Sequence, residues 1–339
     1  MAGNFVQLHN HTHYSLLDGA SKVPDLVKRV KELGMPAVGI TDHGNMHGAY
    51  ELWRAAVDSG VKPIIGIEAY VTPETARQDK TRVSWDTNWT PVPGHARNPD
   101  DVSGGGLITH LTMWAENDEG LVNLIKASSV ANLEGRVMRY PRMDKEVLST
   151  YSKGVIASSG CPSGIIQTRL RLGQFDEALR AAGEFQDIFG KDNFYIELMD
   201  HGLSIESKVT GDLLTIAKKL GAPLLATNDS HYVMEADKDA QDAMLCINSG
   251  ATLDDPNRFK FEGSGYYIKS AEEMRELFKD HPDACDNTLE IAERCNVIFD
   301  DHEDGAFMPQ FDCPEGWDET SLFLKKVEEG LEKRYDGIL

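Results

Sequence analysis

Pro63-Ile64-Ile65-Gly66-Ile67-Glu68-Ala69-Tyr70 is the stretch that decides the fold class, because it shows how the chain is organised. This β-like run follows a helix-like stretch, Ala49–Ser59, and Gly60, a position where a left-handed helix cap is expected. Helix-like and β-like runs alternate on both sides of it, which predicts an α/β fold with a parallel sheet wrapped by helices, and seven such units favour a barrel over an open sheet. The expected strands are Val6–His11, Ala37–Thr41, Pro63–Tyr70, Leu107–Trp114, Gly154–Ser158, Phe194–Leu198 and Pro223–Thr227. The expected helices include Val23–Leu33, Ala49–Ser59, Leu121–Asn132, Phe175–Phe189 and Ile205–Leu220.

Two regions depart from this alternation. Residues 73–106 carry few aliphatic side chains, and a loop of this length is either functional or disordered. Its Trp85 and Trp89 lie among basic residues and could stack on single-stranded bases; the alternative is a mobile insertion whose tryptophans pack locally. After about residue 236 the β-like runs stop. We therefore expect a barrel core over 1–235 with a loop insertion at 73–106, an α-helical remainder over 236–310, and over 311–339 the start of a linker and helix leading into a longer chain.

The composition excludes several classes of protein. The 34 basic and 55 acidic residues give a net charge of −21, which argues against a general sheath for nucleic acid, because binding by charge alone needs a basic surface. If a phosphate ligand is handled, bound metal ions must supply the local positive charge. Five widely spaced cysteines predict neither a disulfide framework nor a zinc knuckle. No apolar run approaches the roughly 18 residues of a membrane span, and the N-terminus does not resemble a signal peptide, so we expect a cytoplasmic protein.

Metal-ligating residue types gather at the ends of the expected strands. His9, His11 and His13 alternate in the first strand, so their imidazoles are expected to project from one face and converge on metal. The runs Thr41-Asp42-His43-Gly44 and Thr227-Asn228-Asp229-Ser230-His231 follow later strands, where barrel enzymes place catalytic residues. The remaining candidates in such positions are Asp18, Glu68, His110 and Cys161. At least six strand ends with these side chains on one rim predict a multinuclear metal site.

The motifs that carry these residues resemble those of the polymerase and histidinol phosphatase (PHP) superfamily. They read HNHTHYSLLDG, TDHG, GIEAYV, ITHLTMWA, SSGCPSG and ATNDSHY, in that order. The intervening sequence, including NLIKASS, most closely resembles the PHP domains at the N-terminus of bacterial replicative DNA polymerase III alpha subunits. The resemblance covers roughly residues 5 to 310. It implies a distorted seven-stranded (βα)7 barrel with a C-terminal α-helical appendage. It also implies that residues 311–339 lead into a polymerase body that this sequence does not include.

The resemblance also implies a metal centre and its ligands. Intact members of the superfamily bind a trinuclear metal cluster through nine ligands at the C-terminal rim of the barrel. Matched motif by motif, the ligands here are His9, His11, Asp18, His43, Glu68, His110, Cys161, Asp229 and His231. None of the nine is replaced, and Asp18, Asp229 and His231 are the expected catalytic residues. Histidine and carboxylate ligands suit Zn²⁺, Mn²⁺ and Fe²⁺, and the thiolate favours Zn²⁺.

The function that the resemblance implies is metal-dependent 3′–5′ exonuclease proofreading within a DNA-directed DNA polymerase. We expect a hydroxide activated by three metal ions to hydrolyse the terminal phosphodiester. The expected partners are single-stranded or mismatched DNA 3′ ends, the polymerase body of the full-length chain, and replisome subunits such as the sliding clamp, but no membrane. Two alternatives stay open: a phosphomonoesterase similar to histidinol phosphatase, and a non-catalytic module that supports the polymerase. Nothing in the chain resembles a polymerase active site, so we expect no primer extension by this fragment.

Several polar residues are expected outside the ligand set. His13 is a candidate for contact with a ligand or with substrate. Asp42 and Asn228 precede ligands and are candidates for orienting imidazoles through hydrogen bonds. His201 is expected to be an ordinary surface histidine.

Overall fold

The computed structural model describes residues 4–91, 98–299 and 311–335, and the chain divides into two compact units, Met1–Phe299 and Asp300–Leu339. The strands of the first unit are β1 Ala37–Ile40, β2 Lys62–Val71, β3 Thr109–Ala115, β4 Arg142–Met143, β5 Val155–Ser158, β6 Phe194–Leu198 and β7 Leu224–Ala226. Its helices are α1 Val23–Glu32, α2 Ala49–Ser59, α3 Ser103–Gly106, α4 Asp118–Glu134, α5 Lys145–Thr150, α6 Ile165–Arg171, α7 Phe175–Phe189, α8 Ser204–Leu220, the 3₁₀ turn η1 Glu235–Asp237, α9 Lys238–Ser249, α10 Ala271–Leu277 and α11 Pro282–Arg294. The second unit contains α12, Glu319–Tyr335.

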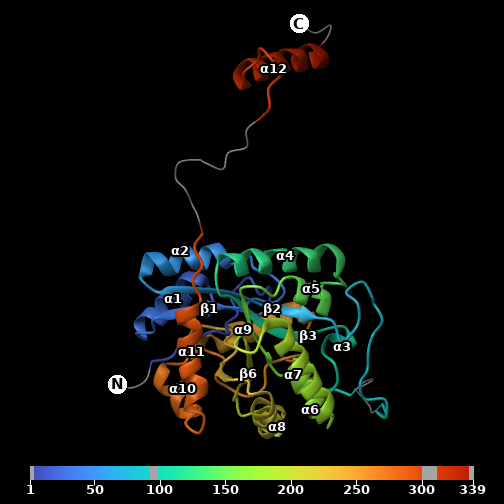
Figure 1. The fold of residues 1–339 in the computed structure, drawn as a ribbon, viewed down its shortest axis with the longest axis vertical. Helices are drawn as coiled ribbons and strands as arrows, with labels where there is room; N and C mark the ends of the chain where they lie inside the picture. Colours follow the sequence, from blue (N-terminus) through green and yellow to red (C-terminus); the bar gives the residue numbers. More distant parts are fainter. Residues whose placement is uncertain (1–3, 92–97, 300–310, 336–339) are drawn as a thin grey trace. The chain divides into compact units, whose positions relative to one another are not determined.

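The strands form one curled seven-stranded sheet that is surrounded by helices (Figure 1). Hydrogen-bonded neighbours follow the order β1-β2-β3-β5-β6-β7, with β4 paired to β2. The extended segment 7–10 bridges the two ends of this order, because Gln7 pairs with Val38 in β1 and Asn10 pairs with Ser230 beyond β7. The arrangement is the α/β barrel that the alternation of runs predicted.

Two details of the predicted sheet were wrong. The expected first strand, Val6–His11, makes only these isolated bridges, and single bridges on each side do not build a ladder. The sheet is also not wholly parallel, since β3 runs antiparallel to both β2 and β5. The connection from β2 to β3 contains only the four-residue helix α3 among its described residues, so β3 starts near the edge where β2 ends.

The inside of the barrel is apolar at one end and polar at the other. A cluster of buried side chains fills the apolar end, with members from nearly every strand and from α11: Val6, Leu8, Ala37, Ile64, Trp114, Ile156, Tyr195, Leu225, Ile291, Ala292 and Cys295. Along β2, Ile64 and Glu68 share one face because side chains alternate along a strand. Ile64 therefore belongs to the apolar floor, and Glu68 lies four residues nearer the opposite rim. Helix α11 packs at the floor and leaves that rim free for polar side chains.

A larger apolar core lies between the sheet and the helices. Helix α1 buries Val23, Leu26, Val27 and Val30, the three- and four-residue spacing of one helix face. Gly60 and Gly221 end α2 and α8 with positive φ angles of 72° and 60°, as helix caps of this kind require.

The described part of the insertion at 73–106 packs against the barrel. The guanidinium of Arg169 lies 3.8 Å from the ring centroid of Trp85, and Asp101 accepts hydrogen bonds from the backbone of Trp85 and Asp86. Trp85 is therefore engaged in local packing. None of the described helices is long and apolar enough to cross a membrane.

Candidate metal centre

All nine side chains predicted as ligands meet at the polar rim of the barrel, and each has a short contact with at least one other member. His43 follows β1, Cys161 follows β5, and Asp229 and His231 follow β7. His110 lies at the beginning of β3 rather than at the end of a strand. The antiparallel direction of β3 explains why it reaches the same rim: His110 pairs with Tyr70, near the carboxyl end of β2.

Glu68 is the buried hub of the cluster. Its Oε2 lies 2.6 Å from Nδ1 of His43, and its Oε1 lies 3.2 Å from Nδ1 of His110. The same carboxylate lies 3.5 Å from Nε2 of His9 and 3.6 Å from Nε2 of His11. One carboxylate thus faces four imidazoles from three different parts of the sequence.

Asp229 and Asp18 occupy the other side of the cluster. Asp229 Oδ1 lies 3.0 Å from Nε2 of His11 and 3.3 Å from Nε2 of His9. Asp18 Oδ2 lies 2.8 Å from Nε2 of His43 and 3.6 Å from Nε2 of His231. Asp229 holds a φ of +43°, a strained conformation for a residue other than glycine. Two residues apart, Asp229 and His231 both enter the site, with Oδ1 of Asp229 3.7 Å from Nδ1 of His231.

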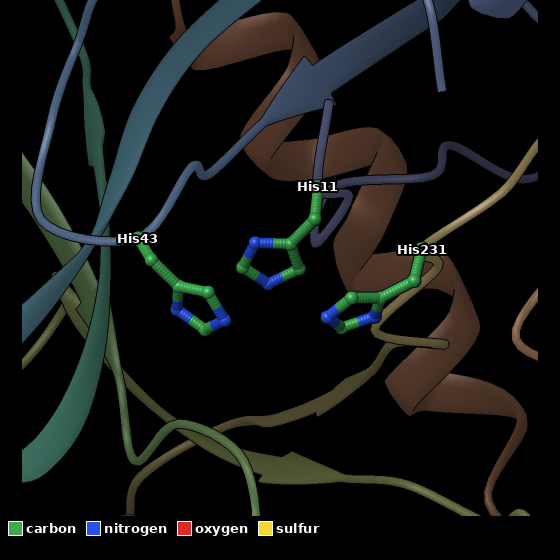
Figure 2. Close-up of side chains that lie close together, drawn as sticks. All are labelled: His11, His43 and His231. Carbon is green, nitrogen blue, oxygen red and sulfur yellow. The ribbon is translucent and has the colours of Figure 1, made fainter. Parts of the chain in front are cut away.

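Three groups of side chains could each hold a metal ion, because their ligand atoms lie within 4.8 Å of one another. They are His9, His11 and Asp229; His11, His43 and His231; and His43, Glu68 and His110. Figure 2 shows the second group, in which the three imidazoles come from separate segments and turn toward a common point. Cys161 adds a sulfur 3.3 Å from Nδ1 of His110, beside the third group.

The arrangement of the donor atoms suits metal binding better than it suits hydrogen bonds among these side chains. Among the described residues, seven of these buried atoms have short ion-pair contacts but no hydrogen bond of acceptable geometry: His9 Nε2, His11 Nε2, His43 Nδ1, both Glu68 oxygens, Asp229 Oδ1 and His231 Nε2. Buried polar atoms without partners are costly and rare in native structures. Their convergence at one place is what a set of divalent-cation ligands requires.

Burial and the neighbouring charges shift the pKa values throughout the cluster. Burial acts to lower the pKa of His9, but the carboxylates of Glu197 and Asp229 outweigh it and hold that pKa well above its usual range. Burial, reinforced by the like charges of His43 and His231, lowers the pKa of His11 to about 3. Burial acts to raise the pKa of Glu68, but His110 and His43 hold it well below its usual range. The carboxylates are thus ionised and demand compensating positive charge.

Cys161 responds in the opposite direction. Burial raises the pKa of its thiol well above the usual range, and the negative charges of Glu68 and Asp229 add to the effect. The thiol is therefore protonated at neutral pH, and it would lose that proton on binding a metal ion.

A second layer of hydrogen bonds holds the imidazoles in place. His9 Nδ1 donates to Oε1 of Glu197 over 2.7 Å, which leaves Nε2 directed at the cluster. His11 Nδ1 lies 2.8 Å from the hydroxyl of Ser15, and that hydroxyl donates to Asp42. Ligand histidines in metalloproteins are commonly fixed in this way by a carboxylate or hydroxyl on the other ring nitrogen. Asp42 acts on His11 through Ser15.

Glu197 was missed in the sequence. It is fully buried in β6, and its carboxylate also accepts hydrogen bonds from Ser158 and Thr227. The available signal was a single charged residue inside the apolar run Phe194–Leu198. Such a residue is rarely buried without a partner.

Other polar residues lie elsewhere than expected. His201 is buried, not at the surface: its Nδ1 donates to Glu206 over 2.7 Å, and its ring stacks on Tyr266. His13 contacts the ring of Tyr14 and the backbone oxygen of Ser21, away from the ligand cluster. The side-chain amide of Asn228 donates to the backbone oxygens of residues 265 and 267. It therefore holds this loop in place and does not orient an imidazole.

Comparison with known proteins identifies the family of the chain. The PHP domain family matches residues 7–201. The chain is 51% identical over 336 residues to DNA polymerase III subunit alpha of Mycobacterium leprae, covering 98% of the chain and 28% of that protein. The corresponding protein of Mycobacterium tuberculosis (strain CDC 1551 / Oshkosh) is 50% identical over 333 residues, and that of Borreliella burgdorferi is 39% identical over 338 residues. In both, 98% of the chain aligns with 27% of the relative, so the chain spans about a quarter of the length of these curated proteins.

Solved structures give weaker likenesses. An amidohydrolase from Chromobacterium violaceum is 15% identical with a TM-score of 0.41, over 67% of this chain and 87% of that one. At this identity and TM-score, the likeness says nothing about the chemistry of the site. The family match covers more than half of the residues, and its range contains seven of the nine clustered side chains. The chain therefore belongs to the PHP domain family, and nearly all of it aligns with a part of DNA polymerase III alpha subunits.

Proposed function

We propose that this chain is a metal-dependent 3′–5′ exonuclease domain of a replicative DNA polymerase, and that the buried rim cluster is its catalytic metal centre. The observation that carries the proposal is the convergence of seven buried donor atoms without hydrogen-bond partners among the described residues. The similarity to DNA polymerase III alpha subunits supports DNA as the substrate. We extend to this chain the partners expected of the full-length protein: the polymerase body, the sliding clamp and other replisome subunits in the cytoplasm.

Three divalent ions, with Zn²⁺ the first choice, would be held by the nine clustered side chains, in which three overlapping groups share His11 and His43. The groups are His9, His11 and Asp229; His11, His43 and His231; and His43, Glu68 and His110, with Cys161 beside the last. Because Nδ1 of His11 is occupied by the hydroxyl of Ser15, its Nε2 would bind only one of the ions. Bound divalent cations supply charge neutralisation for a phosphodiester and make water more acidic. The need for them follows from the net charge of −21, since an acidic protein otherwise repels DNA.

Exposure indicates the direction from which a DNA end would arrive. The side chains of His9 and Glu68 are 0% and 1% exposed, whereas those of Asp18, His43, Asp229 and His110 are 17%, 15%, 14% and 13% exposed. A scissile phosphate would therefore approach over these four partly exposed side chains, of which Asp18 and Asp229 carry the negative charge. His231 lies beneath this edge, 2% exposed and 3.6 Å from Asp18, and would hold a metal ion through Nε2 while its Nδ1 donates to the backbone oxygen of Asp229. The buried members would position the ions and keep water from the floor.

The proposal is tested by digestion of a 3′-mismatched primer–template with the zinc- or manganese-loaded chain. A variant carrying Asp18→Asn and Asp229→Asn removes two charges from the exposed edge. A second variant, Asp187→Asn with Asp212→Asn, removes two charges from the exposed faces of α7 and α8 and serves as the control. We expect stepwise 3′ shortening by wild type and the control, and a loss of at least 100-fold in the Asp18/Asp229 variant.

The competing functions give different results in the same experiment. Hydrolysis of a phosphomonoester without any shortening of DNA would replace the exonuclease with a phosphatase. Full metal loading with no hydrolysis of either substrate would indicate a structural module. Thermal unfolding of each variant separates loss of catalysis from loss of fold.

A further inference from the structure

We propose that the loop segment Arg258–Phe261, together with Lys238 of α9, binds the last nucleotides of the DNA strand by stacking its bases and pairing with its phosphates. The inference rests on the proposed exonuclease function and names the surface that would hold its substrate. The segment reads Arg258-Phe259-Lys260-Phe261, so basic and aromatic side chains alternate along it.

A cavity of about 440 Å³ lies beside this segment, within the range of about 300–1,000 Å³ typical of ligand pockets. Its lining includes Lys238, Arg258, Lys260 and Phe261, with Tyr232 and Tyr266 behind them. The cavity adjoins the metal centre through two of its lining residues. Gln241 donates a hydrogen bond to the backbone oxygen of Asp18, and the ring of Phe261 lies 4.6 Å from that of His231.

The loop is anchored firmly enough to act as a binding wall. The buried Tyr266 donates its hydroxyl hydrogen bond to the backbone oxygen of Glu262, and its own backbone oxygen accepts from His231. Gly263 has a φ of +77°, and a Cβ there would lie 2.5 Å from the backbone oxygen of His201. The wall is therefore tied to the same residue, His231, that the metal centre uses.

The aromatic rings of the wall are presented in two different ways. Phe261 packs edge-on against His231 and Tyr266, with ring centroids 4.6 and 4.8 Å apart, and is only partly exposed. Phe259 is 61% exposed, and its ring lies 6.1 Å from that of Phe261. An exposed phenylalanine next to a phosphoesterase-type metal centre suits stacking on a nucleobase, and every base has a face that can stack.

The charges of the wall complement a phosphate backbone. Arg258 forms two hydrogen bonds with the carboxylate of Asp242 and is neutralised there. Lys238 and Lys260 are exposed and make no ion pair with any residue that the structure describes. Glu262 also lines the cavity, so with Arg258 and Asp242 paired, two lysines face one carboxylate and the lining keeps a local positive excess in a chain of net charge −21. Stacking combined with lysine–phosphate contacts is the usual way to bind single strands without regard to sequence.

The test measures binding of a 5′-fluorescein-labelled ten-nucleotide oligo-dT by fluorescence anisotropy, with zinc present and a phosphorothioate at the last linkage to block hydrolysis. A second oligonucleotide lacks the bases of its last two nucleotides. Phe259→Ala is compared with Phe323→Ala, which removes a similarly exposed phenylalanine from α12. Phe261→Leu keeps an apolar contact with His231. Lys260→Gln is compared with Lys126→Gln, an exposed lysine on α4.

We expect Phe259→Ala to weaken binding of the complete strand about tenfold, the scale of one base–aromatic stack, and to change binding of the base-free end by less than about twofold. Lys260→Gln should lower the slope of log affinity against log salt by about 0.7. Both control variants should bind as wild type does.

The inference would be overturned if Phe259→Ala weakened both strands equally, if neither strand responded to it, or if wild type bound neither strand. Its failure differs from failure of the proposed function. DNA shortening by wild type with no dependence of binding on Phe259 would retain the exonuclease and reject this surface. Base-dependent loss of binding without any shortening would retain the surface and reject the exonuclease.

Discussion

Replacement of Glu197 by Gln perturbs the metal centre without touching a predicted ligand. The carboxylate is buried, and it accepts hydrogen bonds from His9, Ser158 and Thr227. A glutamine has nearly the same shape, but its amide nitrogen cannot accept, so at least one of the three donors loses its acceptor. The charge that fixes the His9 ring is also removed.

The magnitude follows from these contacts. Removing a carboxylate that orients a ligand histidine typically lowers metal affinity 10- to 100-fold, or about 1.4–2.7 kcal/mol. A buried donor left without an acceptor costs a further ~1–3 kcal/mol of stability. We therefore expect Glu197→Gln to hold zinc 10- to 100-fold more weakly at its most affected site and to unfold at a lower temperature.

Zinc competition against a chromogenic chelator measures the affinity, and thermal unfolding with and without zinc measures the stability. Glu272→Gln, an exposed glutamate in the first turn of α10, makes the same chemical change away from the site and should leave both unchanged. Zinc affinity within twofold of wild type in a correctly folded Glu197→Gln chain would refute the role assigned to this carboxylate.

Three further predictions test other parts of the account. Gly66→Ala should lower the free energy of unfolding by about 3 kcal/mol in urea, because the added Cβ would lie 2.5 Å from the backbone oxygen of Met113; a loss below about 0.5 kcal/mol would contradict this packing. Burial lowers the pKa of Lys269 from its usual 10.5 to about 8, so the unfolded chain binds more protons than the folded chain between these two pH values. The free energy of unfolding of wild type should therefore rise from pH 8 to 10.5 relative to that of Lys269→Met, and parallel stability curves for the two proteins would contradict it. Because the carboxylates of Glu197 and Asp229 outweigh burial and raise the pKa of His9, zinc binding should release protons and weaken as pH falls. Calorimetry in buffers of different ionisation enthalpy measures the release, and its absence would contradict the site.

The fold was largely predictable because its signal is local. Apolar β-like runs between helix-like runs identified six of the seven expected strands, from Ala37–Thr41 onward. The direction of β3 was not predictable, since it depends on where the long connection from β2 returns the chain. The same holds for segment 7–10, which closes the barrel through single bridges on each side rather than as a regular strand.

The candidate site was predictable to the extent that its residues carry motifs. The nine proposed ligands match the PHP motifs, and the structure brings all nine to one rim. The supporting residues were harder to find, because their role is created by packing. Glu197 offered only one charge in an apolar run, and Phe261 reaches His231 from thirty residues further along the chain. His201 had no sequence signal for its burial against Glu206.

Anomalous diffraction at the zinc absorption edge, from crystals of this chain grown with Zn²⁺, tests most directly whether the rim cluster is a metal centre. The account predicts three anomalous peaks inside the rim, each about 2.0–2.3 Å from ligand atoms of one of the three groups. The ligand atoms should belong to the nine clustered side chains, and Nε2 of His11 should contact only one of the peaks. Peaks confined to the outer surface, with none among these residues, would contradict it.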